Sequence, residues 1–529
     1  MVAGRPAVTR SLRQSMAWIH SWLGLLAGWI LFAMFLTGTA SYFRPEITRW
    51  MQPEMPVNHT PATIAAQNAV SQLSRDGIHD QQWFIQLPND RDVVTHVYAT
   101  PKPDAAEAKG QKPGTRRKRA EEQVLDPATG APIHARDTRG GEHFYRFHFQ
   151  LQLPHPWGRW LAGVCAMFML GAIISGVVTH KRIFADFFTL RWNKGQRSWL
   201  DAHNVSAVLA LPYHAVITYT GLMTLVLMYL PYPIAINYKQ PLDFGREAYG
   251  LPQDAVATGR ATPLVPIAPL VRDAEARLQR PAARVVVQQP GDAAAIVAVT
   301  GAAQSSLNAR AGTVVYSGAT GALLQPPSGA GTGVSTVGVM LGLHLAQYAA
   351  PALRWVLFLL GLTGAAMVGT GLLLWTAARR KPGARPFFGL RLVERLNIAT
   401  IAGLPIGMGA YLLANRVIPA AAEGRAAAEV ATMFYVWGGA AVLQLLRPAR
   451  QAWAILFAAG AAVYAAIPIA NALTTSRGLA ASWRAGDQLF MSFDVAMLGI
   501  AALLGLAAWR AARPRRVQVS RRTREMVHV

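Results

Sequence analysis

The sequence predicts an α-helical integral membrane protein with about eight transmembrane helices, in which two small α+β domains are inserted into an internally repeated four-helix core. Three observations lead to this prediction. Of the 529 residues, 52% are hydrophobic and 15% are charged, and the mean hydropathy is +0.23, so a soluble fold would leave too much apolar surface uncovered. Apolar runs of about 20 residues, long enough to cross a bilayer, recur along the chain. Two long polar segments interrupt them.

Eight apolar runs are predicted to span the membrane. They cover residues 17–43, 157–180, 203–232, 352–376, 396–418, 426–446, 452–474 and 488–510. Basic residues cluster before the first run and after every second run, at Arg10 and Arg13, 181–197, 379–395, Arg447 and Arg450, and 513–524. This alternation is the positive-inside pattern, and it predicts that both termini are cytoplasmic. It also accounts for the net charge of +24, and we expect no nucleic-acid partner.

One basic run departs from this pattern. Lys112 to Glu122 would lie on the outer side, but it belongs to a long translocated segment, where the positive-inside rule has little force. We interpret it as a solvated surface run rather than a binding patch.

The runs divide the chain into seven successive segments. These are the N-terminus and first span (1–49), an outer domain (50–145), spans two and three with their cytoplasmic loop (146–234), a second outer domain (235–340), the fourth span (341–380), four additional spans (381–512) and a basic cytoplasmic tail (513–529). Each outer domain is predicted to contain a helix, a pair of strands and a closing hairpin in that order. The matching stretches are TPATIAAQNAVSQL, QQWFIQLPNDRDVVTHVYAT and EEQVLDPATGAPI, and PIAPLVRDAEARLQ, ARVVVQQPGDAAAIVAVTG and GTVVYSGATGALLQ.

The register of the spans repeats as well. Seventeen residues separate a histidine from a Thr-Gly pair in both the first and the third run, which contain His20 with Thr37-Gly38 and His203 with Thr220-Gly221. Runs two and four align with a slip of one residue, which brings His148 near His344. We therefore predict two copies of a helix, outer domain and helix, related by an axis along the membrane normal. The last four runs show no such match.

Six histidines are candidate cofactor ligands. His20, His180 and His203 map to the cytoplasmic ends of their spans, whereas His148, His214 and His344 map to the middle or outer half. On a continuous helix, the eleven residues between His203 and His214 turn about 20° beyond three turns and rise about 16 Å, so the two side chains would share one face. Imidazoles at two depths on neighbouring helices are what two stacked haems with axial histidines require.

Haem explains this set better than zinc does. A zinc site usually has three or four ligands, often cysteines or carboxylates, whereas these spans contain almost no acids. The single cysteine, Cys165, excludes an intrachain disulfide and a cysteine-pair site. A haem needs two facing imidazoles and a slot lined by small residues, which could be Gly24, Gly28, Gly163, Gly171, Gly176 or Gly221. Structural histidines and a proton or metal relay remain as alternatives.

The pairing of the ligands stays open at this level. The repeat makes His20 and His203 symmetry mates on the inner side, and His148 and His344 on the outer side. We expect His203 to face His180 or His20, and His214 to face His344 or His148, and His155 is an alternative to His148. Pro212 is expected to kink the third span, either to turn His214 towards a pocket or without functional consequence.

Several spaced motifs resemble those of one family. WIHSWLGLLAGWILFAMFLTG, YRFHFQL, GVVTHKRIFADFFTLR and WLDAHNVSAVLALPYH, with the two outer domains, are similar to PepSY-associated transmembrane proteins over about residues 12–380. These are also called iron-regulated membrane proteins, and they include ferrisiderophore reductases of the bacterial inner membrane. The resemblance implies periplasmic PepSY domains, two b-type haems and reduction of siderophore-bound ferric iron. It assigns the recurrent histidines to His20, His148, His203 and His344, and His180 and His214 fit longer members.

These expectations describe a transmembrane oxidoreductase to which we assign no catalytic side chain. Its acceptor would be a ferric siderophore or another periplasmic oxidant, and its electron donor would be quinol or a separate protein, since no Gly-rich dinucleotide fingerprint follows a strand in a cytoplasmic segment. One alternative is a membrane-anchored PepSY-domain regulator or protease inhibitor without redox activity. Another is a transporter that uses Asp494 as a relay, although a hydrogen-bonded structural aspartate also explains that residue.

Overall fold

The computed structural model describes residues 11–56, 59–76, 80–102, 122–180, 187–250, 252–327, 331–381 and 383–513. The basic run at 112–121, the loop residues Lys181 and Arg182, Arg10 and most of the C-terminal tail lie outside these residues. The chain divides into two compact units, Met1–Gly371 and Leu372–Val529.

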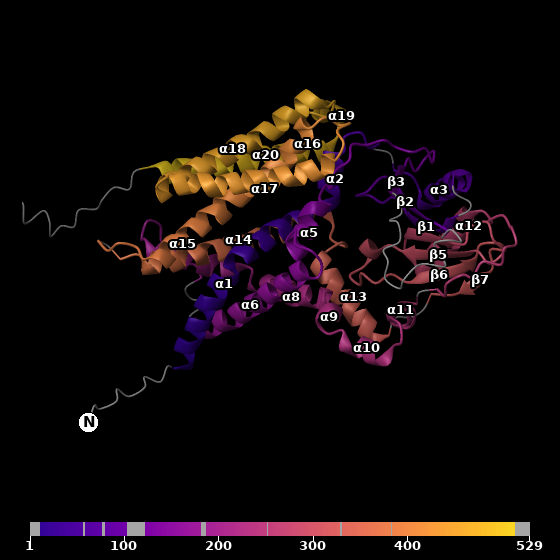
Figure 1. Cartoon of the computed structure of the whole chain (residues 1–529), viewed down its shortest axis with the longest axis horizontal. Coiled ribbons are helices and arrows are strands. Elements are labelled where there is room, and N and C mark those ends of the chain that lie inside the picture. Colours follow the sequence, from indigo (N-terminus) through magenta and orange to yellow (C-terminus); the bar gives the residue numbers. More distant parts are fainter. Residues whose placement is uncertain are drawn as a thin grey trace, which may run out of the picture. The chain divides into compact units, whose positions relative to one another are not determined.

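Seven helices of the described chain are long and apolar enough to cross a membrane (Figure 1). They are α1 (Leu12–Ser41), α6 (Trp157–Thr179), α14 (Pro351–Arg379), the continuous stretch of α15 and α16 (Phe388–Val417), α17 with the short turn after it (Arg425–Leu446), α18 (Ala449–Thr474) and α20 (Gln488–Ala512). The pair α7 (Gln196–Leu209) and α8 (Leu211–Thr224) passes the same test as one bent span and makes the eighth. Every predicted run therefore coincides with one of these spans, and the protein is a multi-pass membrane protein.

The third span is broken rather than continuous. The axes of α7 and α8 differ by 68°, and Pro212 occupies the first turn of α8, where its missing N–H cannot continue the hydrogen-bond ladder of α7. The kink predicted at Pro212 is confirmed. The prediction that His203 and His214 share one helix face is wrong, because the two residues lie on different helices.

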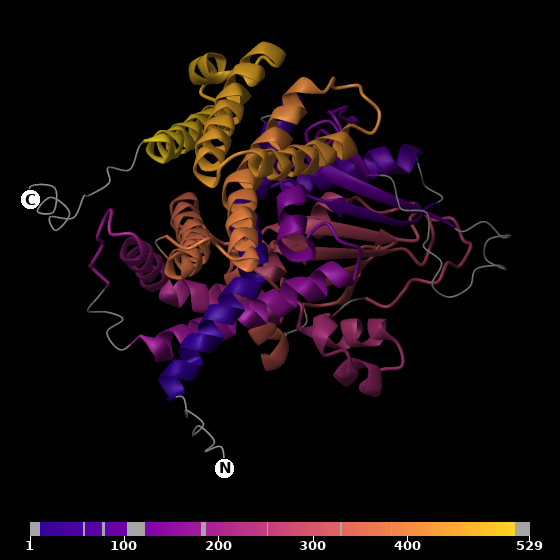
Figure 2. The same ribbon diagram turned by 60° about the vertical axis from the view of Figure 1, so that its left-hand side comes forward.

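The strands of both polar segments form one antiparallel sheet. The first segment contributes β1 (Asp80–Gln86), β2 (Thr95–Pro101) and β3 (Glu122–Leu125), and the second contributes β4 (Ala282–Gln288), β5 (Ile296–Gly301), β6 (Thr313–Ser317) and β7 (Leu323–Gln325). Their order is β3-β2-β1-β4-β5-β6-β7, so the segments meet where Ile85 of β1 lies opposite Val285 of β4. Figures 1 and 2 show the purple strands beside the salmon ones. The predicted strands are present except in the closing hairpin of the first segment, where β3 is followed by a single bridge between Leu125 and Pro132. The pairing of the segments leaves neither β1 nor β4 as an open edge.

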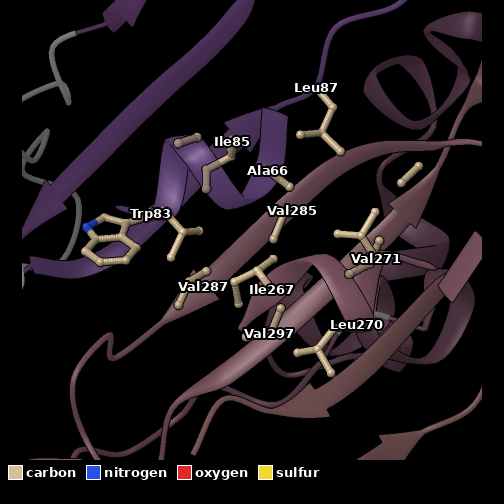
Figure 3. Packing of buried hydrophobic residues seen from close by; sticks show 14 of the residues in the cluster. Ala66, Trp83, Ile85, Leu87, Ile267, Leu270, Val271, Val285, Val287 and Val297 are labelled. Atoms are coloured by element: carbon tan, nitrogen blue, oxygen red, sulfur yellow. The ribbon is translucent and has the colours of Figure 1, made fainter. Parts of the chain in front are cut away.

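One hydrophobic core serves both halves of the sheet. The helices α3 (Ala62–Asp76) and α12 (Ile267–Leu278) pack on the same face, as predicted for a helix in each segment. Because alternate residues of a strand point to one face, Trp83 and Ile85 of β1 lie beside Val285 and Val287 of β4 under these helices, as Figure 3 shows. All four side chains are fully buried.

Within the first unit, ion pairs connect the sheet to the long helices. Arg91, in the loop between β1 and β2, binds Glu46 of α2 (Arg44–Met51) at 2.8 Å and donates to the carbonyl of Tyr42. Arg354 of α14 binds Oε1 of the same carboxylate at 2.7 Å, and Nε of Arg91 contacts this oxygen at 2.8 Å. Two shorter helices, α5 (Glu142–Gln150) and α13 (Thr332–Leu345), precede α6 and α14. Between α8 and α12 the chain forms α9 (Val226–Tyr229), α10 (Tyr232–Asn237) and α11 (Pro241–Tyr249).

The second unit is a helical bundle built on α16 (Gly403–Val417). This helix continues α15 (Phe388–Asn397) through a π-helical turn at Ile398–Ala402, and it packs against α17 and α18, while α18 packs against α20. The widened turn exposes the carbonyl of Ala399, which accepts a hydrogen bond from Trp437 Nε1 at 2.8 Å. A short helix, α19 (Leu479–Ala485), lies between α18 and α20 in the chain.

Candidate functional site

The first unit brings four of the six candidate histidines together in two pairs. The ring centres of His20 on α1 and His203 on α7 are 6.0 Å apart, and their planes are inclined by 67°. The ring centres of His148 on α5 and His344 on α13 are 6.1 Å apart, with planes inclined by 32°. Each pair joins the two residues that the sequence repeat makes symmetry mates.

The inner pair consists of His20 and His203. A main-chain carbonyl of a long helix accepts a hydrogen bond from each ring. Nδ1 of His20 lies 2.8 Å from the carbonyl oxygen of Ala172 on α6. Nδ1 of His203 lies 2.8 Å from the carbonyl oxygen of Met367 on α14. Because a carbonyl can only accept, this contact assigns the proton of each neutral ring to Nδ1. The Nε2 atom of each ring therefore carries a free lone pair.

The outer pair, His148 and His344, repeats this arrangement on the other two helices. Nδ1 of His148 donates to the carbonyl of Met34 on α1 at 2.7 Å, and Nδ1 of His344 donates to the carbonyl of Ile217 on α8 at 3.0 Å. All four rings are partly accessible rather than fully buried. The four long-helix segments α1, α6, α8 and α14 each supply one carbonyl to one ring.

A glycine lies four residues after each of these carbonyls. Residues n and n+4 lie on the same side of a helix, so a ring that reaches the carbonyl of residue n covers residue n+4. A Cβ atom added there would lie 3.1 Å from the ring of His20 or His203, 2.9 Å from His344 and only 2.5 Å from His148. The glycines are Gly176, Gly371, Gly221 and Gly38, respectively.

A hydroxyl residue precedes each glycine, and each hydroxyl has the same partner within its own helix. It donates to the carbonyl four residues earlier, at 2.6 to 2.7 Å. The four dipeptides are Thr37-Gly38, Ser175-Gly176, Thr220-Gly221 and Thr370-Gly371. In two of them the hydroxyl also approaches the imidazole, since Thr220 Oγ1 lies 3.2 Å from Nδ1 of His344 and Ser175 Oγ lies 3.4 Å from Nδ1 of His20.

His214 and His180 occupy different surroundings. His214 is fully buried, with its ring centre 5.9 Å from that of Phe35 on α1 and its Nε2 3.3 Å from the hydroxyl of Thr363 on α14. His180, at the end of α6, receives a hydrogen bond from the side-chain amide of Asn204 at 3.0 Å. The break before Pro212 accounts for the position of His214, because α8 leaves the direction of α7 there. His155 is exposed in the turn before α6.

The helix that carries His148 is fixed by charges outside the long helices. Glu142, in the first turn of α5, accepts from Arg44 at 3.2 Å and from Arg146 at 2.9 Å. Burial lowers the pKa of the neighbouring His143 to about 4, and the positive charge of Arg139 acts in the same direction. His143 is therefore neutral at pH 7 and packs as an aromatic ring against Phe147.

Sequence reasoning found only part of the glycine pattern. Gly176 and Gly221 were among the predicted slots, whereas Gly38 and Gly371 were not, and a Cβ on Gly24 would have open space around it. The available signal was the recurrence of a hydroxyl residue before glycine in all four core spans. Of these four dipeptides, the prediction of the repeat uses only the two Thr-Gly pairs that lie at the same distance from a histidine.

In each pair the hydrogen bond to the carbonyl uses Nδ1, so the Nε2 atoms of the two imidazoles keep the lone pair with which histidine binds a metal. Among the residues that the structure describes, no three His, Cys, Asp or Glu side chains gather in a group suited to a metal ion. Two imidazoles that face each other are the side-chain set of a haem site with two axial histidines.

The comparison with known protein families agrees with this architecture. The family model for the PepSY-associated TM region matches residues 17–378. This range contains both histidine pairs and both segments of the sheet. Comparison with curated proteins gives no match. Because the family model covers more than half of the chain, the protein belongs to the family of PepSY-associated transmembrane proteins.

Proposed function

We propose that the protein is a haem-containing reductase of the bacterial inner membrane. It passes electrons across the bilayer to a periplasmic ferric siderophore or a similar acceptor, and Fe(II) is released. The observation that carries this proposal is the presence of two imidazole pairs, in each of which Nδ1 is bound to a carbonyl and Nε2 is left free.

The distances within the pairs fit haem ligation. Two imidazoles that bind one metal ion from opposite sides, with metal–nitrogen bonds of about 2 Å, have ring centres about 6 Å apart. The measured separations are 6.0 and 6.1 Å. The hydrogen bond at Nδ1 fixes the tautomer and the orientation of the ring, as second-shell carbonyls do for metal-bound histidines.

In this proposal His20 and His203 hold one haem and His148 and His344 hold the other. A b-type haem supplies a carrier that takes up and passes on one electron at a time. The positive-inside pattern places the sheet in the periplasm and both termini in the cytoplasm, so the inner pair lies nearer the cytoplasm. In this orientation the two pairs would lie at different depths of the bilayer.

In the proposed reaction the electrons balance, and reduction leads to release of the iron. Each ferric ion takes one electron, so a quinol, which gives two electrons and two protons, serves two ferric ions. A separate protein could supply the same electrons. Hard oxygen donors of a chelate hold Fe(III) more tightly than Fe(II), and reduction therefore weakens the complex.

Haem content tests the proposal directly. We expect the purified wild-type protein to contain about two b-type haems per chain, and His20→Ala and His344→Ala variants to contain about one each. His134→Ala, in an exposed segment of the first unit, is the matched control and should keep the full content. The measurement is the absorption spectrum of the pyridine haemochrome against protein concentration.

Activity is measured in proteoliposomes that receive quinol and an external ferric siderophore. A coloured Fe(II) chelator outside the vesicles should report iron reduction in the wild type, and the two ligand variants should lose it. Colourless wild-type protein from cells supplied with haem would contradict the proposal. That result would favour the membrane-anchored PepSY-domain regulator, which needs no cofactor.

A further inference from the structure

We propose that the four Ser/Thr-Gly dipeptides of the core helices are seats that position the axial imidazoles and set the angle between their planes. A seat is defined here as a carbonyl at residue n, a hydroxyl residue at n+3 and a glycine at n+4. The four seats are Ala172–Gly176, Met367–Gly371, Met34–Gly38 and Ile217–Gly221. This inference rests on the proposed function, because it concerns the residues that support the haem ligands.

Each part of a seat has a separate physical task. The carbonyl accepts the Nδ1 proton and so directs Nε2 away from the helix. The glycine leaves the space that the ring fills, and a methyl group in its place would push the ring outward. The hydroxyl donates to the carbonyl of residue n−1 at 2.6 to 2.7 Å. In three seats it also lies 3.0 to 3.4 Å from the carbonyl of residue n, so it shares this acceptor with the imidazole and limits how strongly the carbonyl holds Nδ1.

The seats are the same in all four helices, but the two pairs are not equivalent. The planes of the inner pair are inclined by 67° and those of the outer pair by 32°. Nearly parallel imidazole planes separate two of the iron d orbitals in energy, whereas crossed planes leave them close together. A ferric low-spin haem held by the inner pair should therefore show a larger g anisotropy, with its first signal at lower magnetic field.

The tightness of the seats predicts graded effects of alanine. The outer seats are the tightest, because a Cβ would lie 2.5 Å from His148 at Gly38 and 2.9 Å from His344 at Gly221. The inner seats leave 3.1 Å at Gly176 and Gly371, so a small ring displacement can accommodate the methyl group. We expect Gly38→Ala to lose about half of the haem and Gly371→Ala to keep it with a changed angle between the rings.

The experiment compares haem content and the electron paramagnetic resonance spectrum of the oxidised protein. Gly371→Ala should shift only the low-field signal, and Gly38→Ala should remove only the other signal. Gly499→Ala on α20 is the matched control, since it lies in the second unit and nothing lies within 4 Å of its added Cβ. Alanine favours a helix more than glycine does, so a loss at a seat is not an effect on the helix itself.

A second pair of variants covers the possibility that a glycine variant fails to fold. Thr370→Val keeps the shape of the side chain and removes the hydroxyl that shares the carbonyl of Met367 with His203. We expect it to retain both haems and to shift the low-field signal, because the carbonyl then binds only the ring. Thr432→Val is its control, because Thr432 makes the same bond to its own helix, to the carbonyl of Ala428 at 2.8 Å.

The failure of this inference differs from the failure of the proposed function. If the wild type contains both haems and the seat variants show the spectrum and haem content of Gly499→Ala, the seats do not position the ligands. If the wild type contains no haem, the proposed function and the seats are both overturned. A shift of both signals in a single-seat variant would also contradict the assignment of one seat to one ring.

Discussion

Histidines perform different tasks in this protein because their two nitrogens meet different partners. In the four paired rings Nδ1 donates a hydrogen bond to a main-chain carbonyl. His214 instead lies between Phe35 and Thr363. His96, on β2 of the sheet, lies between two carboxylates, with Nε2 3.1 Å from Asp92 and Nδ1 2.9 Å from Glu122. Burial disfavours the charge of His96, but the two hydrogen-bonded carboxylates outweigh it and raise the pKa to about 10.

This raised pKa predicts a pH-dependent contribution to the stability of the sheet. The charged form is favoured in the folded state, so the contribution is complete below pH 6.5 and is lost as the pH rises towards 10. The pKa difference sets an upper bound of about 5 kcal/mol, and screening at the half-exposed Glu122 reduces the expected contribution to the free energy of unfolding to about 2 kcal/mol. His96→Gln should therefore lower the melting temperature at pH 6 and have little effect at pH 10.5.

Thermal unfolding followed by tryptophan fluorescence measures this effect in the full chain. His134→Gln, at an exposed position, is the control and should change the melting temperature at neither pH. An equal loss for His96→Gln at both pH values would show that packing rather than charge explains the effect.

Among the helices, the second unit contains a buried polar network that a hydropathy pattern does not reveal. Arg425 and Glu429 of α17 form an ion pair of 2.9 Å with both side chains fully buried, and Asn415 of α16 donates to Glu429 at 2.8 Å. Arg425 also donates to the carbonyls of Asn415 and Ile418 and so satisfies the end of α16. The network therefore fixes the turn between two helices.

Asp494 of α20 is part of a similar connection. Its carboxylate accepts a hydrogen bond from Asn471 of α18 at 2.9 Å, and Asn471 accepts one from Arg416 of α16 at 2.9 Å. Both Asp494 and Asn471 are fully buried. The hydrogen bond expected of a structural aspartate is therefore present, and it belongs to a chain of contacts that links three helices of the bundle.

Removal of Glu429 should be strongly destabilising. Glu429→Ala leaves the buried guanidinium of Arg425 without its carboxylate, and the loss of one partner of a buried pair typically costs about 3 to 5 kcal/mol of the free energy of unfolding. Glu423→Ala, at an exposed position before the same helix, should change it by less than about 0.5 kcal/mol. The melting temperatures of the purified variants measure the difference. Similar values for the two variants would mean that water or lipid headgroups reach the network.

For the whole molecule, the order of spans could be predicted but the union of the two polar segments could not. Each segment contains the expected helix and strands, and the sequence suggested two separate small domains. The structure places β1 beside β4, across almost two hundred residues of chain, and gives α3 and α12 a common core. Hydrophobic alternation is the same for an edge strand and a central strand, so the sequence pattern contains no information on this pairing.

The topology of the chain predicts which surfaces face the periplasm. In a Cys165→Ala background, Thr320→Cys in the β6–β7 turn should react with a membrane-impermeant thiol reagent in intact spheroplasts. Arg385→Cys, in the basic loop after α14, should react only after permeabilisation, because basic loops remain in the cytoplasm. Both positions are exposed. Labelling of Arg385→Cys in intact spheroplasts, without labelling of Thr320→Cys, would require the opposite orientation.

The sequence by itself determined the spans, the strands, the candidate histidines and the symmetry mates, because these follow from periodicity and spacing within one element. Only the tertiary structure decided that His20 faces His203 and that His148 faces His344. It also decided that His214 lies against Phe35 and belongs to neither pair. It also decided which glycines have a ring above them. These contacts join helices that cross in space, and a spacing counted along one helix does not specify which face of a neighbour it meets.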